Sequence, residues 1–138
     1  MQYLLDTCTV SYLLRKDEKV IQNLQNKNPE RILISSITIH EVEYGLKLNP
    51  QKALKIQPFW DDFCKEIKIL PYDADDAKSA AIIRAYLKQR GEVIGNFDVL
   101  IASVALSKNL VCVTSNVFEF SRVPRLVIQD WRNSPIIS

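Results

Sequence analysis

The sequence predicts an α/β domain with a central, mostly parallel β-sheet flanked by helices. Short apolar runs, typical of buried strands, alternate with longer stretches whose apolar residues recur at helical spacing. Strands separated by helices need crossover connections, which pair the strands in parallel. The chain has 138 residues, of which 47% are hydrophobic and 25% charged. This size and composition suit one globular domain, so we expect a single domain over residues 1–138.

Five segments have the composition of strands. Most are short apolar runs, and the third (EIKIL) alternates apolar and charged residues, as a half-buried strand does. In chain order the predicted strands cover residues 2–5, 31–35, 66–70, 110–113 and 126–128.

Six segments predict helices. The second places Val20, Ile21 and Leu24 on one face. The fourth contains Pro58, which we expect to break or kink it. The fifth consists mainly of strong helix formers and ends before Gly91, and the sixth is apolar enough to be buried on most sides. In chain order the predicted helices cover residues 10–14, 17–27, 37–48, 51–65, 74–90 and 97–107.

Charge and cysteine content exclude several classes of protein. The net charge of +2 permits an anionic partner without indicating one. Cys8, Cys64 and Cys112 are odd in number and form no CxxC pair, so we expect free thiols, with Cys112 buried, rather than disulfides or a zinc site. No apolar run approaches the ~18–20 residues that span a bilayer. No signal region opens the chain, so a cytoplasmic location is expected.

A set of acidic residues follows the predicted strands. Asp6 ends the first strand, Glu41 lies one turn into the helix after the second, and Asp98 lies at the start of the buried helix. Asn116 and Glu119 follow the strand at residues 110–113. Ligands of open parallel sheets bind outside the carboxyl ends of the strands. We therefore expect these side chains to converge.

The same residues also have local explanations. Asp6 could cap the following helix, and Thr38-x-x-Glu41 matches a capping box. Asn96 could cap the helix whose dipole favours Asp98. If the carboxylates do converge, two unit charges ~4 Å apart at an effective dielectric of ~20 repel by roughly 4 kcal/mol. A hard divalent cation such as Mg²⁺ or Mn²⁺ would offset that repulsion.

The ordered motifs resemble the VapC toxins, which are PIN-domain ribonucleases of toxin–antitoxin pairs. They are LLDT, ISSITIHEVEYG, GEVIGNFDVLIASVAL and LVCVTSNVFEF, with RVPRLVIQDW at the end, and they extend over nearly the full chain. The resemblance implies a PIN fold with an acidic pocket at the carboxyl edge of the sheet. Asp6, Glu41 and Asp98 match the three main acidic positions of the family. Many members carry an Asp where this chain has Asn116, with Glu119 three residues further on.

Three neighbouring positions also bear on the site. Thr7 and Thr114 match positions where the family often has a hydroxyl or another small polar group. Cys8 stands where the family commonly has Asn, which removes one polar group beside Asp6.

The chemistry that the resemblance implies is Mg²⁺- or Mn²⁺-dependent hydrolysis of RNA, with tRNA favoured as substrate. Asp6 and Asp98 would hold one ion, and Glu41 with Glu119 or Asn116 would hold a second ion or its waters. The metal would activate a water and stabilise charge on the phosphate, giving 5′-phosphate and 3′-hydroxyl ends. The resemblance also implies a homodimer and a VapB-type antitoxin that obstructs the acidic pocket.

Other side chains receive weaker assignments. Phe97 and Phe118 could stack on a base, but core packing is the preferred interpretation, and Trp60 and Trp131 are assigned to packing or to an interface. The single histidine, His40, excludes a two-histidine ribonuclease and is expected to be partly exposed. Basic residues could line an RNA path, although a solvated charged face explains each equally well. These residues are Arg15, Lys16, Lys88, Arg90, Arg122 and Arg125.

Two rival functions remain from the sequence. One is a PIN nuclease of RNA maturation outside any toxin pair, which the absence of a neighbouring antitoxin gene would favour. The other is an inert PIN-like binding module, which Asn116 makes conceivable and which would show no metal-dependent cleavage. Nucleophile-elbow and phosphate-loop motifs are absent from the sequence. A receiver domain also has carboxylates at strand ends, but it needs a pair of acidic residues near its start and a lysine late in the chain, and neither can be placed in this sequence.

Overall fold

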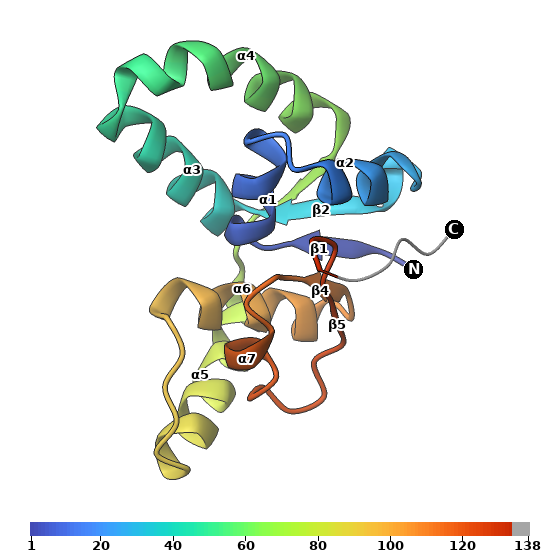
Figure 1. Cartoon of the computed structure of the whole chain (residues 1–138). Helices are drawn as coiled ribbons and strands as arrows, with labels where there is room; N and C mark the ends of the chain where they lie inside the picture. The colour runs from blue at the N-terminus through green and yellow to red at the C-terminus, as the bar shows by residue number, and fades with distance from the viewer. Residues whose placement is uncertain (134–138) are drawn as a thin grey trace.

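The computed structural model describes residues 1–133 and contains a five-stranded sheet (Figure 1). The strand order is β3-β2-β1-β4-β5, and every pair is parallel, which confirms the predicted α/β class. The strands are β1 (Tyr3–Leu5), β2 (Ile32–Ser35), β3 (Lys68–Leu70), β4 (Val111–Val113) and β5 (Ile128–Gln129).

Helices connect these strands along the chain. The 3₁₀ turn η1 (Pro29–Arg31) leads into β2. The helices are α1 (Thr7–Leu14), α2 (Glu18–Gln25), α3 (Ser36–Leu48), α4 (Pro50–Glu66), α5 (Ala74–Gln89), α6 (Asn96–Ser107) and α7 (Val117–Phe120).

Two elements differ from prediction in an instructive way. Of the two effects expected at Pro58, a break or a kink, the break is wrong, because α4 continues through this residue. Pro58 and Leu54 are both exposed, so the Leu54 carbonyl that loses its helical donor faces water. Helix α1 begins at Thr7, three residues before the expected start, because Asp6 caps it.

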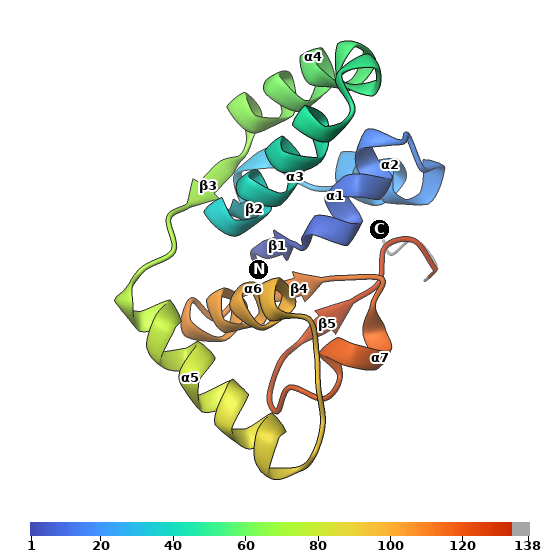
Figure 2. The same ribbon diagram turned by 90° about the vertical axis from the view of Figure 1, so that its left-hand side faces the viewer.

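The sheet is covered on both faces, as Figures 1 and 2 show. Leu4, Leu33 and Cys112 point to the face covered by α5 and α6. Their strand neighbours Leu5 and Val113 point to the face covered by α1 to α4, where the two buried tryptophans lie. No helix within residues 1–133 is both long and apolar enough to cross a bilayer.

The chain order of the strands places the site. From β1 the chain continues to β2 and β3 on one side, and it returns to β4 and β5 on the other. The carboxyl ends of β1 and β4 therefore lie side by side where the strand order reverses, and their loops can form a crevice there.

Candidate active site

Asp6 follows β1 and is fully buried, with 0% of its surface exposed. Its Oδ1 accepts a hydrogen bond from the Thr9 amide at 2.8 Å, so the predicted helix cap is confirmed. Its Oδ2 is buried without a hydrogen-bond partner among residues 1–133. Capping therefore explains only one of the two oxygens, and an unpaired buried carboxylate oxygen is costly unless a ligand satisfies it.

The charge on Asp6 is unfavourable in this structure. Burial raises the pKa of Asp6, the polar groups of Thr114 and Thr9 lower it, and the negative charge of Glu41 raises it further. A cation bound near Oδ2 would reverse that balance.

Asp98 lies in the first turn of α6, and Gly95 leaves room for it. A Cβ at Gly95 would lie 3.3 Å from Asp98 Oδ2. The predicted cap at Asn96 is wrong, because Asn96 is the first residue of the helix and Gly95 occupies the cap position. Burial, followed by the negative charges of Asp6, Glu41 and Glu119, raises the pKa of Asp98 to about 6. The other three carboxylates therefore all lie close enough to act on Asp98.

Glu41 on α3 is oriented by α1. The Thr7 hydroxyl donates to Glu41 Oε1 at 2.6 Å and lies 3.1 Å from the Thr38 hydroxyl. The predicted capping box of Thr38 and Glu41 is wrong, because α3 begins earlier. Its cap is Ser35, whose hydroxyl accepts from the Ile37 amide at 3.0 Å. Glu41 is therefore free of the helix end and bonds across to α1.

Asn116 holds Glu119 in place. The Asn116 amide group donates from Nδ2 to Glu119 Oε2 at 2.9 Å, and its backbone N–H donates to the buried Thr114 hydroxyl at 2.9 Å. A hydrogen bond from Asn116 also lowers the pKa of Asp98. Asn116 thus lies between two carboxylates at the position where many family members have an acid.

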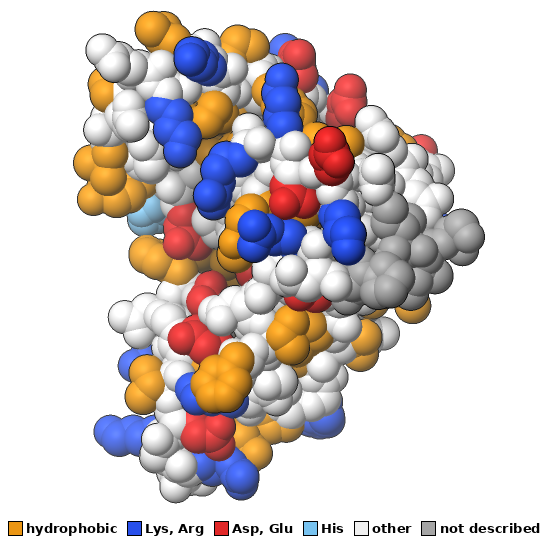
Figure 3. Space-filling view, in the orientation of Figure 1, with side chains coloured by type: hydrophobic (Ala, Val, Ile, Leu, Met, Phe, Trp, Pro, Cys, Tyr) orange, Lys and Arg blue, Asp and Glu red, His pale blue; other side chains and the backbone are white. Residues whose placement is uncertain are grey.

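One cavity of about 320 Å³ joins the carboxyl ends of β1 and β4 with the start of α6. Glu41 lines an adjacent groove of about 170 Å³ together with Thr7. Acidic side chains gather at the waist of the molecule, with lysines and arginines above them (Figure 3). The cavity is lined by Asp6, Cys8, Tyr12, Asp98, Ser115, Asn116, Arg132 and Asn133.

Comparison with known proteins decides the family. The PIN domain family matches residues 3–126. Over 133 residues the chain is 35% identical to the tRNA(fMet)-specific endonuclease VapC of Salmonella typhimurium, covering 95% of this chain and 98% of that protein. It is 36% identical to Ribonuclease VapC2 of Rickettsia felis, with the same coverage. This chain belongs to the VapC family of PIN domains.

The fold agrees with that membership. The DNA-bound VapBC structure of Salmonella typhimurium matches with a TM-score of 0.87 at 35% identity, covering 95% of this chain and 98% of the other. VapBC2 of Rickettsia felis, bound to a fragment of promoter DNA, matches with a TM-score of 0.86 at 34% identity, covering 95% and 99%. The resemblance stated from the sequence motifs is confirmed.

The acidic cavity of this PIN domain has the donor chemistry for a hard cation. No three His, Cys, Asp or Glu side chains within residues 1–133 are grouped tightly enough to ligate one ion together. Mg²⁺ commonly keeps several waters and takes only one or two carboxylates from a protein. The unpartnered Oδ2 of Asp6 and the raised pKa of Asp98 fit such a pair of ligands.

Cys8 lines the same cavity but is a poor nucleophile. Burial, then the charges of Asp6 and Asp98, raises the pKa of its half-buried thiol to about 11. The predicted free thiols are confirmed, with Cys112 buried.

The aromatic residues divide into buried and exposed groups. Trp60 and Trp131 are buried, as predicted. The expectation that Phe97 and Phe118 pack in the core is wrong, because they are 41% and 75% exposed. Each precedes a carboxylate at the site, on the outer side of a helix start. His40 is exposed as expected, and its ring lies 5.4 Å from that of Phe97.

The predicted basic residues are scattered over the surface. Arg15 lines the groove that contains Glu41, and Lys16 follows it at the end of α1. Lys88 and Arg90 lie at the end of α5, which Figure 2 shows at the far tip of the lower half. Sequence reasoning missed Arg132, which lines the acidic cavity. Nothing in the local sequence distinguishes it from other exposed arginines.

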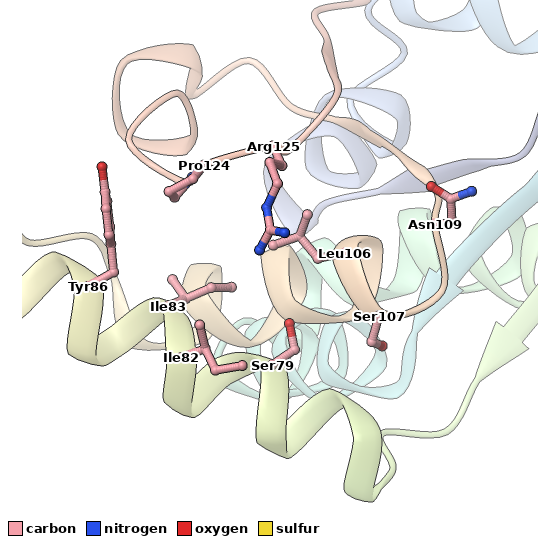
Figure 4. Close-up of a pocket in the computed structure, with 9 residues that line it drawn as sticks. All are labelled: Ser79, Ile82, Ile83, Tyr86, Leu106, Ser107, Asn109, Pro124 and Arg125. Atoms are coloured by element: carbon pink, nitrogen blue, oxygen red, sulfur yellow. The ribbon is translucent and has the colours of Figure 1, made fainter.

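A larger cavity of about 530 Å³ lies elsewhere, between α5, α6 and residues 124–125 (Figure 4). Its lining includes Ile82, Ile83 and Leu106, together with Arg125, and it contains no carboxylate. It has none of the groups that phosphodiester hydrolysis needs, so size alone would have selected the wrong site.

Proposed function

We propose that this PIN domain, residues 1–138, is the toxin of a VapBC-type toxin–antitoxin pair and hydrolyses RNA phosphodiester bonds with Mg²⁺ or Mn²⁺. The observation that carries the proposal is the cavity in which buried Asp6 and half-buried Asp98 meet without a neutralising partner for Asp6 Oδ2. Membership of a family whose curated relatives are ribonucleases supports it.

The residues divide the work by position. Asp6 and Asp98 would hold the ion, which supplies an activated water and stabilises charge on the phosphate. Glu41, fixed by the 2.6 Å bond from Thr7, would hold a second ion or a water on the α3 side. Glu119, fixed by Asn116, would do the same on the α7 side.

Transfer RNA is the substrate class that the relatives favour. The Salmonella typhimurium relative is a tRNA(fMet)-specific endonuclease. Exposed Phe97 and Phe118, beside two of the carboxylates, offer surfaces on which unpaired bases of an RNA loop can stack. Arg15 lines the groove that contains Glu41 and would contact a phosphate, as would Lys16 after it, whereas Lys88 and Arg90 at the end of α5 would contact only a longer RNA.

The partners follow from the same surfaces. The similar solved structures are VapBC complexes, and an acidic cavity attracts a basic antitoxin side chain. The homodimer interface would lie on the side where α3 contacts α6, where Tyr44 and Leu48 of α3 and Phe97 of α6 are exposed apolar side chains. The cytoplasm, where RNA and antitoxin are made, would be the place of action.

Cleavage of total tRNA tests the proposal directly. Purified wild type and Asp98→Asn are each incubated with Mn²⁺ or with EDTA, and the products are mapped on a sequencing gel. Discrete cuts that require both Mn²⁺ and Asp98 are expected. If neither protein cuts, or both cut equally, the nuclease is ruled out and an inert binding module becomes the better description.

A further inference from the structure

Arg132 is the one arginine that lines the acidic cavity among the residues the structure describes there. It comes from the turn after β5, whereas Asp6 follows β1 and Asp98 begins α6. The fold therefore places a guanidinium and two carboxylates around one space of about 320 Å³.

The guanidinium of Arg132 is held in position by α1 and the residue before α2. Its Nε donates to Asp17 Oδ2 at 3.3 Å, and its Nη1 donates to the Tyr12 hydroxyl at 3.2 Å. Its centre lies 4.0 Å from the centroid of the Tyr12 ring. Asp17 is itself fixed, because its Oδ1 caps α2 by accepting from the Val20 amide at 3.2 Å.

The backbone beneath Arg132 is also anchored. Trp131 is buried, and its carbonyl accepts from Asn23 Nδ2 at 3.0 Å. The Arg132 amide donates to Asp130 Oδ1 at 3.1 Å. Part of the conformational entropy of this side chain is therefore already lost before a ligand binds.

The hydrogen-bonding capacity of Arg132 is only partly used. A guanidinium has five N–H donors, and two of its nitrogens have partners among residues 1–133, Nε with Asp17 and Nη1 with Tyr12. The ion pair with Asp17 is partly exposed and therefore weak. The planar fork matches a phosphate, which can take two parallel hydrogen bonds.

A second cation contacts the same tyrosine from the adjacent groove that contains Glu41. The guanidinium of Arg15 is 4.9 Å from the Tyr12 ring centroid, and its Nη2 donates to the Ser11 hydroxyl at 3.1 Å. The positive charges of Arg15 and Arg132 both act on the Cys8 thiol inside the cavity. A polyanionic strand that enters beside four carboxylates needs such cations to offset the repulsion.

We propose that Arg132, on the wall of the acidic cavity, and Arg15, in the adjacent groove, form a phosphodiester-binding subsite around Tyr12. This inference rests on the proposed function, since it assigns the substrate's backbone to that wall. Arg132 contacts a phosphate of the bound strand, and Tyr12 positions Arg132.

Salt-dependent RNA binding tests the subsite apart from cleavage. Asp98→Asn, alone and combined with Arg132→Ala, Arg132→Lys or Arg84→Ala, is titrated with a labelled single-stranded RNA oligonucleotide in Mg²⁺ at several NaCl concentrations. Arg84 is an exposed arginine on α5, away from the cavity, and serves as the matched control.

Arg132→Ala should weaken binding by about 10-fold and reduce the slope of log K against log salt by about 0.7, the contribution of one contact to single-stranded nucleic acid. Arg132→Lys should keep the slope but lose part of the affinity, because a point charge replaces the fork. The affinity and slope of Arg84→Ala should stay near those of Asp98→Asn alone.

The subsite is overturned if Arg132→Ala and Arg84→Ala behave alike, or if affinity falls only together with the melting temperature and at an unchanged slope. Arg132-dependent binding by a protein whose wild type never cleaves tRNA would reject the nuclease and keep the subsite. If the wild type cleaves tRNA and Arg132→Ala changes neither cleavage nor binding, the subsite is rejected and the nuclease is kept.

Discussion

Asp76 and Asp6 are both fully buried carboxylates, but their surroundings differ completely. Asp76 Oδ2 accepts from the Asp73 amide in a capping box at the start of α5. Its Oδ1 accepts from Ser107 and lies 3.2 Å from Lys108 Nζ. Asp6 has one amide donor for Oδ1 and no hydrogen-bond partner for Oδ2 among residues 1–133, and the negative charge of Glu41 raises its pKa.

The difference is the one expected between a structural carboxylate, Asp76, and Asp6, which we propose to be functional. Lys108 and the helix start compensate Asp76, and the Lys108 hydrogen bond lowers the pKa of the neighbouring Asp73. In the acidic cavity burial raises the pKa values of Asp6 and Asp98, and the negative charges of neighbouring carboxylates raise them further. The fold tolerates that cost at the one place where a cation and a phosphate would be bound.

Replacing each of the two by asparagine gives the largest expected contrast. Asn caps a helix as well as Asp does, so Asp6→Asn should fold normally yet cleave RNA about 100-fold more slowly or worse, the order expected when an electrostatic contributor is lost. Asp76→Asn should retain cleavage per folded molecule. Initial rates of tRNA cleavage in Mn²⁺, normalised to folded protein by circular dichroism, measure both, and equal loss in the two variants would erase the distinction.

Truncating Asp76 should destabilise the fold. Asp76→Ala removes the carboxylate that accepts from the Asp73 amide and leaves Ser107 and Lys108 without their buried acceptor, which should lower the free energy of unfolding by about 2–3 kcal/mol. The exposed neighbour Asp75, changed to alanine, is the control and should cost well under half as much. Urea denaturation monitored by fluorescence measures the free energy of unfolding of both variants. Similar decreases for Asp76→Ala and Asp75→Ala would count against the structural role of Asp76.

Removing the hydroxyl that orients Glu41 should have an intermediate effect. Thr7→Val keeps the shape but loses the 2.6 Å bond, so cleavage should fall by about 10-fold, as for other groups that orient a metal ligand. Thr7→Ser should recover most of the rate. If valine and serine act alike at this position, the hydroxyl has no part in orienting Glu41.

The smallest expected effect is a pH-dependent change in stability. Without metal, Asp98 has a pKa of about 6 in the folded protein, above its ordinary value of 3.8. The folded state therefore holds the proton longer than the unfolded state, and stability falls as pH rises between these values. Asp98→Asn has no such proton, so in EDTA its melting temperature should exceed that of wild type by a few degrees above pH 6.5 and by little at pH 4.

Scanning calorimetry across that pH range measures the difference. About 3–5 °C corresponds to each kcal/mol for a domain of this size. A gap between the two proteins that is constant with pH would mean that Asp98 is not the group responsible.

Much of the fold was predictable because burial dominates it. Strands that are covered on both faces appear in the sequence as short apolar runs, and α5 is composed of strong helix formers. The sequence therefore predicted these elements. Boundaries were less accurate where one side chain decides them. Asp6 caps α1, so the helix begins at Thr7. Ser35 caps α3, so Thr38 lies inside the helix, where it contacts Thr7 of α1 instead of forming the expected capping box.

The site was predictable to the extent that chain order fixes it. The ends of β1 and β4 and the start of α6 must meet where the strand order reverses. The residues at these ends, Asp6, Asn116 and Asp98, line one cavity. Arg132 and the pairing of Asp76 with Lys108 depend on contacts between distant segments that leave no local pattern. The exposure of Phe118 was missed for a related reason, since an apolar side chain in a four-residue helix has no periodicity to show which way it faces.

Thermal unfolding with and without Mn²⁺ tests most directly whether the acidic cavity is a cation site. A ligand that binds only the folded state raises the melting temperature in proportion to the logarithm of its concentration above Kd. Mn²⁺ should therefore stabilise wild type and Asp76→Asn by several degrees, and Asp6→Asn or Asp98→Asn by far less. The cation site would be contradicted if Mn²⁺ left the melting temperature of the wild type unchanged. It would also be contradicted if Mn²⁺ stabilised Asp98→Asn as strongly as the wild type.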